Sequence, residues 1–509
     1  MKLLKSASSS KILRESVARV LPLDLLKASL FHELPRLRLA AFQSIGPILG
    51  TYDNLATDPI HCLEVEIDLW RESLPYSFKC SEKEYVVTLT QTLRSFLGRI
   101  SDAEAACDDC NDPLLLKFVN DFLLKDVFVR QAAYPGTVAE KEKWAILMLD
   151  CIVSFASQNH SPKQKKTNKR TQLRRVLPIQ EQWFKNIMTN VLSEDVLATL
   201  ISLMHSMWDS TRSSAYETVL DVLQYAKVEE MNLPRILSDR KSFGLFQARA
   251  IHLASSPRQR EADTGARMLS VLCATMTSTE AQFAYLEMLS DLLMKRVAMM
   301  ESSLGLFADD DTDVPTQRRE ELPLAHGLIR TITLIVENLN FSAVPNANVL
   351  FESMTRTCFR AIEVSLIVVA DVKDDNEESK TAENGDGNDR WKVARAKQAK
   401  NVPLNVNAGA IGANATFASL DPVDDDESKM RLLKQRIVVS SRLGLCLGHI
   451  YTITFNNNLS DAQMGTWLLI KEACSALSPI MASSPVNDAE LLSTAGDLLI
   501  STLTSLKHQ

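Results

Sequence analysis

The sequence predicts an all-α protein, an α-solenoid built from degenerate HEAT or armadillo-like helical repeats with long disordered loops. The first observation is composition. Hydrophobic residues make up 46% of the 509 residues, whereas aromatic residues make up 6% and glycine occurs 16 times. This balance favours helices over sheets. The second observation is that apolar residues recur at helical spacing in segment after segment, with no convincing alternating strand between them.

The expected helices follow one another with short breaks. A helix over residues 81–97 opens with a capping box formed by Ser81 and Glu84. A helix over residues 209–223 opens with Asp209 as its N-cap. The other expected helices cover residues 35–49, 137–155, 279–300, 323–339, 350–370, 430–450, 461–481 and 488–506.

Two segments share a pattern that is typical of stacked helical repeats. They read LPRLRLAAFQSI, starting at Leu34, and WDSTRSSAYETVLDVL, starting at Trp208. Each has a turn residue, an arginine one turn into the helix, then small residues and an apolar run. Small residues let neighbouring helices approach, and the arginine can tie neighbouring turns together. We expect these side chains to be buried between helices: Leu37, Ala41, Leu147, Leu220 and Leu272.

One repeat array is expected, interrupted by three stretches rather than divided into separate domains. Helical repeats are expected over residues 1–156, 179–303, 322–370 and 429–509. Between them lie a basic loop at 157–178, an acidic loop at 304–321 and a mostly disordered insertion at 371–428. The compositions of the first two stretches and of residues 371–389 are typical of mobile segments. Residues 402–420 are more apolar and are expected to lie along the surface of the solenoid.

The residues that common enzyme and metal sites need are missing from the sequence. It has no phosphate-binding glycine loop, no G-x-S-x-G and no H-E-x-x-H motif, and its eight histidines are isolated from one another. The one C-x-x-C, Cys107 to Cys110, has no second pair to complete a zinc site. The nine dispersed cysteines, without a secretory signal, indicate reduced thiols in a cytosolic or nuclear protein. We therefore expect no catalytic residues, no metal and no cofactor in this chain.

A run of cations is the first candidate binding site, although the formal net charge of the chain is −7. Seven basic residues occur there without an acid: Lys163, Lys165, Lys166, Lys169, Arg170, Arg174 and Arg175. Such a run binds phosphates by releasing counterions, or else is a solvated loop or a localisation signal. No aromatic residue interleaves with it, so a contact with nucleic acid would be to the backbone.

The stretch SSPRQREADTGARMLSVLCATM, residues 255–276, predicts a helix with a charged first turn and an N-cap at Ser256. Arg258 and Arg260 stand at its N-terminal end, where the helix dipole disfavours cations. They are expected either to pair with acids of an adjacent repeat or to contact RNA phosphate or a partner enzyme. Gly265 and Ala266 are expected where a neighbouring helix approaches, because small residues permit close packing.

Six segments of the chain carry motifs that occur in the same order in a known protein family. They read FLLKDVFVRQAAYPGTVAEKEKWAILMLDCIV, MWDSTRSSAYETVLDVL, SPRQREADTGARML, LPLAHGLIRTITLIVENL, GTWLLIKEACSAL and LLSTAGDLLISTLTSLKHQ. Together they resemble, over roughly residues 21–509, the thyroid adenoma-associated (THADA) protein family, whose fungal members are auxiliary subunits of a tRNA ribose methyltransferase. That family is longer on both sides and carries Arg-Arg-Ser-Ala-Gly-Leu-Pro downstream. The chain is therefore expected to be a central fragment whose repeats at 429–509 are truncated.

The resemblance implies a non-catalytic scaffold, an auxiliary subunit that promotes 2′-O-ribose methylation in the tRNA anticodon loop. Its partners would be tRNA and the catalytic subunit of the tRNA 2′-O-methyltransferase, which would bind S-adenosylmethionine. Its location would be cytoplasmic, without membrane contact. The expected RNA-binding residues are the seven cations of the basic run together with Arg258 and Arg260. The sequence leaves open a protein–protein interaction scaffold with no RNA role, which the acidic balance favours.

Overall fold

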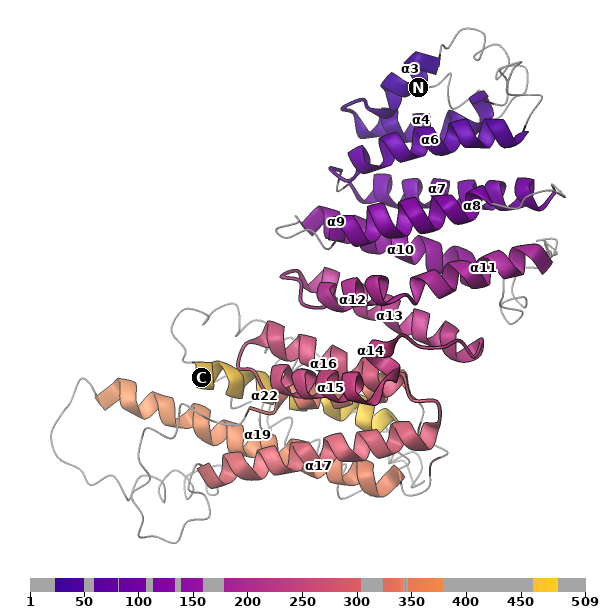
Figure 1. Cartoon of the computed structure of the whole chain (residues 1–509). Helices are drawn as coiled ribbons and strands as arrows, with labels where there is room; N and C mark the ends of the chain where they lie inside the picture. The colour runs from indigo at the N-terminus through magenta and orange to yellow at the C-terminus, as the bar shows by residue number, and fades with distance from the viewer. Residues whose placement is uncertain are drawn as a thin grey trace, which may run out of the picture. The chain divides into compact units, whose positions relative to one another are not determined.

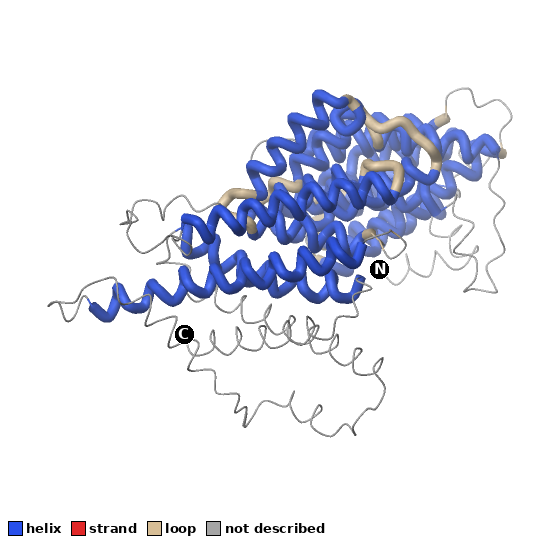
Figure 2. The backbone as a smooth tube through the Cα atoms, turned by 90° about the horizontal axis from the view of Figure 1, so that it is seen from below, coloured by secondary structure: helices blue, strands red, loops and turns tan. Residues whose placement is uncertain are grey.

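The computed structural model describes residues 23–49, 59–80, 82–106, 113–132, 139–158, 178–303, 324–339, 341, 344, 347–378 and 461–483. Within these ranges every regular element is a helix, and Figure 2 shows helices and connecting loops but no strand. The all-helical class expected from the composition is therefore confirmed for the described residues.

Helices follow one another along the whole of the described chain. In chain order they are α3 (Leu23–Leu30), α4 (Pro35–Leu49), α6 (Pro59–Ser77), α7 (Lys83–Ala105), α8 (Leu114–Lys117), η1 (Phe118–Val129), α9 (Arg130–Ala132), α10 (Ala139–Gln158), α11 (Pro178–Val191), α12 (Glu194–Leu203), α13 (Asp209–Val228), α14 (Arg235–Ser238), α15 (Arg240–Ala254), α16 (Gln259–Ala274), α17 (Thr279–Ser303), α18 (His326–Asn338), α19 (Ala347–Glu378) and α22 (Asp461–Ser483). The segment η1 is wound as a π-helix. None of the described helices combines the length and apolar character needed to cross a membrane.

The chain divides into two compact units. Unit 1 comprises residues 1–249 and 267–277, and unit 2 comprises residues 250–266 and 278–509. Helix α16 contributes its first half to unit 2 and its second half to unit 1.

Unit 1 is a stack of helices in two series (Figure 1). In the first series α4, α7, α10 and α13 contact one another in turn, and in the second η1 contacts α6, α11 and α12. A chain of rings runs through the core, with centroid distances of 4.6 Å between Phe42 and Trp70, 5.4 Å between Trp70 and Phe96, and 5.6 Å between Phe96 and Phe118. Because each ring comes from a different element, these few aromatic residues join four helices into one core.

Unit 2 packs α22 against both α18 and α19, and α17 against the same two helices. All of α18 from His326 to Val336 is buried except Arg330. A helix that is apolar on nearly every side must be surrounded by protein, so α18 forms the centre of this unit. Between α19 and α17, the Arg360 guanidinium donates two hydrogen bonds to the Glu301 carboxylate, one of them 2.9 Å long.

The sequence predicts helices better than it predicts their starts. Helix α4 has the expected bounds. Helix α7 begins later than expected, at Lys83, and the side chain of its N-cap, Glu82, makes no cap hydrogen bond. The first helical bond runs from the Val86 N–H to the Glu82 carbonyl at 3.0 Å. The expected capping box depends on Ser81, which lies outside the described residues.

Two other expectations need correction. Helix α13 has Trp208 as its N-cap, so Asp209 is its first helical residue rather than its cap. The Asp209 carboxylate is bound instead by arginine side chains. Helix α19 continues to Glu378, so the first residues of the expected insertion at 371–428 are helical.

The burial expected between helices holds in part. Ala41 and Leu272 are fully buried, whereas Leu37, Leu147 and Leu220 are only half-buried. In each of these three cases the fully buried stripe of the helix passes through neighbouring positions, such as Ala215 and Val219 of α13.

Several predicted features lie outside the described residues. They are the seven cations of the basic run, the pair Cys107 and Cys110, the acidic loop at 304–321 and the expected helices at 430–450 and 488–506.

Candidate functional site

The N-terminal end of α16, which belongs to unit 2, is held by a hydrogen bond between Ser256 and Glu261. The helix begins at Gln259, later than expected, and the Ala262 N–H donates to the Arg258 carbonyl at 3.0 Å. The Ser256 hydroxyl donates to the Glu261 carboxylate at 2.6 Å and accepts the Arg258 N–H at 3.2 Å. Ser256 therefore orders the turn before the helix, and its hydrogen bond is the main reason why the pKa of Glu261 is lowered.

Arg258 and Arg260, at the N-terminal end of α16, are both exposed. The Arg258 guanidinium lies 3.5 Å from Glu261, and 72% of its side chain is open to solvent. Its partner belongs to its own helix, so the expected pairing with an acid of an adjacent repeat is not found among the described residues. The Arg260 carbonyl accepts the Thr264 hydroxyl at 2.8 Å, while its side chain is directed to solvent.

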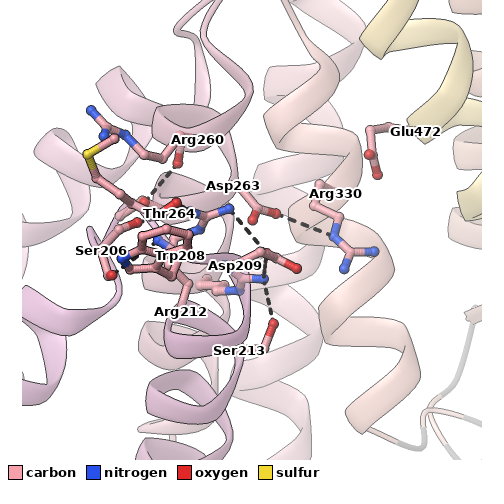
Figure 3. Close-up of polar contacts among 12 residues, drawn as sticks. Ser206, Trp208, Asp209, Arg212, Ser213, Arg260, Asp263, Thr264, Arg330 and Glu472 are labelled. Carbon is pink, nitrogen blue, oxygen red and sulfur yellow. Dashed lines mark hydrogen bonds and ion pairs between the residues drawn. The ribbon is translucent and has the colours of Figure 1, made fainter. Parts of the chain in front are cut away.

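Unit 2 also contains four charged side chains, which we call the charge cluster: Asp263 of α16, Arg330 of α18, and Lys471 and Glu472 of α22. Figure 3 shows Asp263, Arg330 and Glu472. The Arg330 Nε atom lies 3.8 Å from an Asp263 carboxylate oxygen, and the Lys471 Nζ atom lies 3.7 Å from a Glu472 carboxylate oxygen. Burial raises the pKa of Glu472, and the positive charges of Arg330 and Lys471 oppose that shift. Two acids and two bases therefore balance one another where three helices meet, an arrangement suited to fixing how these helices pack.

A neutral histidine lies near the charge cluster. His326, the first residue of α18, is 2% exposed, and neither ring nitrogen has a hydrogen-bond partner within the described residues. Burial, and then the charge of Lys471, lower the pKa of His326 from 6.5 to about 4. At neutral pH the ring is therefore uncharged and packs as part of the core.

Within unit 2, two glycines let α18 and the parts of α15 and α16 that belong to this unit meet at close range. A Cβ atom on Gly265 of α16 would lie 2.3 Å from the backbone nitrogen of Ala254, and one on Gly327 of α18 would lie 2.3 Å from the carbonyl oxygen of Ala254. Ala254 is the last residue of α15. The expected close approach at Gly265 is therefore confirmed, and Gly327 makes a second one to the same residue.

In unit 1, the turn before α13 is held by an arginine from the first turn of that helix. The Arg212 Nη1 atom donates to the carbonyls of Ser206 and Met207 at 2.9 and 3.2 Å, and the Trp208 N–H donates to the Ser206 hydroxyl at 3.2 Å. The Asp209 carboxylate accepts from Arg212 at 3.1 Å and from Arg267 at 3.3 Å. Figure 3 shows Asp209 and Arg212 in this arrangement.

The turn before α4 is built in the same way. The Arg38 Nη1 atom donates to the carbonyls of His32 and Glu33 at 2.7 and 3.0 Å, and the Leu34 N–H donates to the His32 ring nitrogen Nδ1 at 3.1 Å. In both turns the arginine follows the residue before the helix by four positions. We call residues 32–38 and 206–212 the pinned turns. The arginine that the sequence pattern singles out therefore ties the turn that precedes its own helix.

Hydrogen bonds place the starts of α4, α7, α10 and α13 side by side. They run from Arg38 to the Tyr85 hydroxyl at 3.3 Å, from the Trp144 indole to the Cys80 carbonyl at 2.9 Å, and from the Ser206 hydroxyl to the Glu142 carboxylate at 2.6 Å. We call this side of unit 1 its N-terminal edge. Both pinned turns belong to it.

Replacing Arg212 by lysine should lower the free energy of unfolding by about 1–2 kcal/mol, because an ammonium group cannot reach two carbonyls and a carboxylate at once. Arg212 is 7% exposed, so the bonds it leaves unmade are largely shielded from water. Chemical denaturation would measure the change. Arg235→Lys, at an exposed position, is the control, and equal stability of the two variants would contradict a structural role for the guanidinium.

Sequence reasoning singled out Arg258 and Arg260 but missed the charge cluster. The signal was present, since Arg330 and the pair Lys471–Glu472 are charged residues inside apolar runs, HGLIRTITLIV and WLLIKEACSAL. Asp263 lies near the N-terminal end of α16, where the helix dipole favours a negative charge, and its carboxylate faces Arg330 of another helix.

Within the described ranges, no group of three His, Cys, Asp or Glu side chains is arranged to hold a metal ion. Comparison with known proteins adds no identification: no protein-family model, no curated protein and no solved structure matches the chain.

Proposed function

We propose that the chain is a non-catalytic helical-repeat scaffold of the HEAT or armadillo type, an auxiliary subunit of a tRNA methyltransferase. It would promote 2′-O-ribose methylation in the anticodon loop by holding tRNA and the cytoplasmic catalytic subunit together. The catalytic subunit would bind S-adenosylmethionine. The resemblance to the thyroid adenoma-associated protein family suggests this activity, and the serial contacts between the helices of unit 1 suit a repeat scaffold.

The observation that carries the proposal is that three of the resembling segments come together in unit 2. The segment SPRQREADTGARML supplies Asp263 and Gly265, LPLAHGLIRTITLIVENL supplies Gly327 and Arg330, and GTWLLIKEACSAL supplies Lys471 and Glu472. The first two segments pack closely against Ala254 at Gly265 and Gly327. All three segments contribute side chains to the charge cluster. Motifs that are distant in sequence but share one packed site are expected if the resemblance reflects a common structure.

The exposed arginines support a role in RNA binding. The acids and bases of the charge cluster balance one another, and Arg258 and Arg260 are both exposed, with the Glu261 carboxylate 3.5 Å from the Arg258 guanidinium. Arginine at a surface binds phosphate groups, and each contact releases counterions.

The proposal is tested by changing both arginines. The double variant Arg258→Ala/Arg260→Ala should keep the stability of the wild-type chain but bind tRNA more weakly. The plot of log affinity against log salt should become shallower by up to about 2, since each lost phosphate contact removes about one unit. Gel shifts with tRNA at several salt concentrations would measure both quantities.

The variant Arg240→Ala/Lys241→Ala is the matched control, because it removes two exposed cations from the start of α15, the helix that precedes α16 in the chain. It should leave the tRNA affinity nearly unchanged. If the arginine variant loses stability while its affinity and salt slope stay the same, the two arginines are structural.

The second candidate function is a protein–protein scaffold without an RNA role. The net charge of −7 favours it, because an acidic surface repels nucleic acid. Failure of the wild-type chain to bind tRNA at low salt would select this candidate.

A further inference from the structure

Unit 1 presents large apolar side chains to solvent from both pinned turns. Trp208 is 56% exposed and its neighbour Met207 is 75% exposed, while Leu34 in the other pinned turn is 60% exposed. Trp208 and Leu34 occupy the same position, directly before the first helical residue. Because both turns lie on the N-terminal edge, the same feature occurs twice on one side of the unit.

A large apolar residue is an unusual choice at this position. The residue before a helix is preferentially Ser, Thr, Asp or Asn, because its side chain accepts a hydrogen bond from the first turn. Trp208 makes no cap hydrogen bond. Helix α13 therefore lacks a contribution to its stability that a small polar residue would supply. A local preference broken without a compensating contact indicates a functional position.

The backbone that carries Trp208 is held in place. The carbonyls of Ser206 and Met207 and the N–H of Trp208 all have partners within the pinned turn, and the Ser206 hydroxyl is bonded to Glu142. What this turn offers to a partner is therefore the indole and the thioether. Side chains presented from a fixed backbone lose less entropy on binding than those of a mobile loop.

The charges in this bonded network favour a protein partner over RNA. The network contains two carboxylates, those of Asp209 and Glu142, and two guanidinium groups, those of Arg212 and Arg267. It has no surplus of positive charge, from which nucleic-acid affinity is largely drawn. Protein interfaces, in contrast, are enriched in Trp and Met at their centres and depleted in charged residues there.

We infer that Met207 and Trp208 form a docking point for a protein partner, which receives them in an apolar pocket, with Leu34 as a second contact on the same edge. The inference rests on the proposed function, within which this partner is the catalytic subunit of the tRNA methyltransferase. The docking point belongs to unit 1, whereas the arginines assigned to tRNA belong to unit 2.

The test measures binding of the purified full chain to the purified tRNA 2′-O-methyltransferase catalytic subunit by calorimetry. Trp208→Asn removes the indole and supplies a preferred cap residue, so the midpoint of thermal unfolding should stay the same or rise. The Kd should nevertheless rise at least about 10-fold, as expected for truncation of a central tryptophan. Val228→Asn is the matched control, because Val228 is 67% exposed at the other end of α13. It should leave the Kd unchanged.

Three other results would overturn the inference. If the wild-type chain binds the methyltransferase and Trp208→Asn binds it equally well, the docking point is wrong and the proposed function stands. If the variant binds tRNA more weakly but the methyltransferase equally well, the occupant is RNA. If the wild-type chain does not bind the methyltransferase, the proposed function fails, and this inference fails with it.

Discussion

Replacing Gly265 by alanine should lower the free energy of unfolding by about 3 kcal/mol, the upper end of the usual cost of overpacking. The added Cβ atom would lie 2.3 Å from the Ala254 nitrogen and 2.6 Å from the Ala250 carbonyl oxygen. Both are backbone atoms of a helix and cannot move aside as a flexible side chain would. Helices α15 and α16 must therefore separate. Urea denaturation would measure the loss.

A matched control is available in α15. Gly244 lies inside that helix, and a Cβ atom there would meet no atom within 4 Å. Gly244→Ala should therefore raise the free energy of unfolding by about 0.5–1 kcal/mol, because alanine loses less backbone entropy in a helix. Gly327→Ala should behave like Gly265→Ala. If alanine were tolerated equally well at all three positions, the close packing around Ala254 would be refuted.

Acidification from pH 7 to pH 4 should remove about 3 kcal/mol of unfolding free energy through His326 alone. Burial holds its pKa near 4 in the folded protein, against an ordinary value of 6.5. Between pH 6.5 and pH 4 the His326 ring binds a proton in the unfolded chain but stays largely unprotonated in the folded protein. This contribution is therefore fully present above pH 6.5 and is lost progressively as the pH falls towards 4.

The variant His326→Leu isolates this effect, because it removes the titrating ring from the core. Between pH 7 and pH 4 its stability should fall by about 3 kcal/mol less than that of the wild-type chain. His252→Leu, at an exposed position of α15, should leave the pH dependence nearly unchanged. Parallel curves for wild type and His326→Leu would show that the ring is protonated at similar pH in both states.

The sequence predicts the helices because their apolar periodicity is a local property. It is less successful at helix starts, where side chains from other parts of the chain decide the geometry. Asp209 is a good N-cap by local preference, yet its carboxylate is bound by Arg212 of the same helix and by Arg267 of α16. A contact of that kind depends on the fold and cannot be deduced from the residues around Asp209.

In the candidate site, too, features set by local sequence could be predicted, whereas contacts between distant residues could not. The close approach at Gly265 could be predicted because Gly265 and Ala266 place two small residues at one turn, and the structure confirms it. Gly327 fulfils the same role from α18 but follows a histidine in an apolar run that gives no such signal. The pairing of Asp263 with Arg330 required knowledge of which helices are neighbours. The assignment of Arg258 and Arg260 to RNA remains a prediction.

The pinned turns separate the residues that determine shape from the residue that can determine recognition. In each of them the arginine and a side chain two positions before the cap hold the backbone, and the side chain at the cap position takes no part in these bonds. That side chain is leucine in one turn and tryptophan in the other, on the same backbone framework. Mutation at this position can therefore alter what the surface recognises without loss of the fold, so the N-terminal edge is a place where new binding specificity can evolve at low cost to the scaffold.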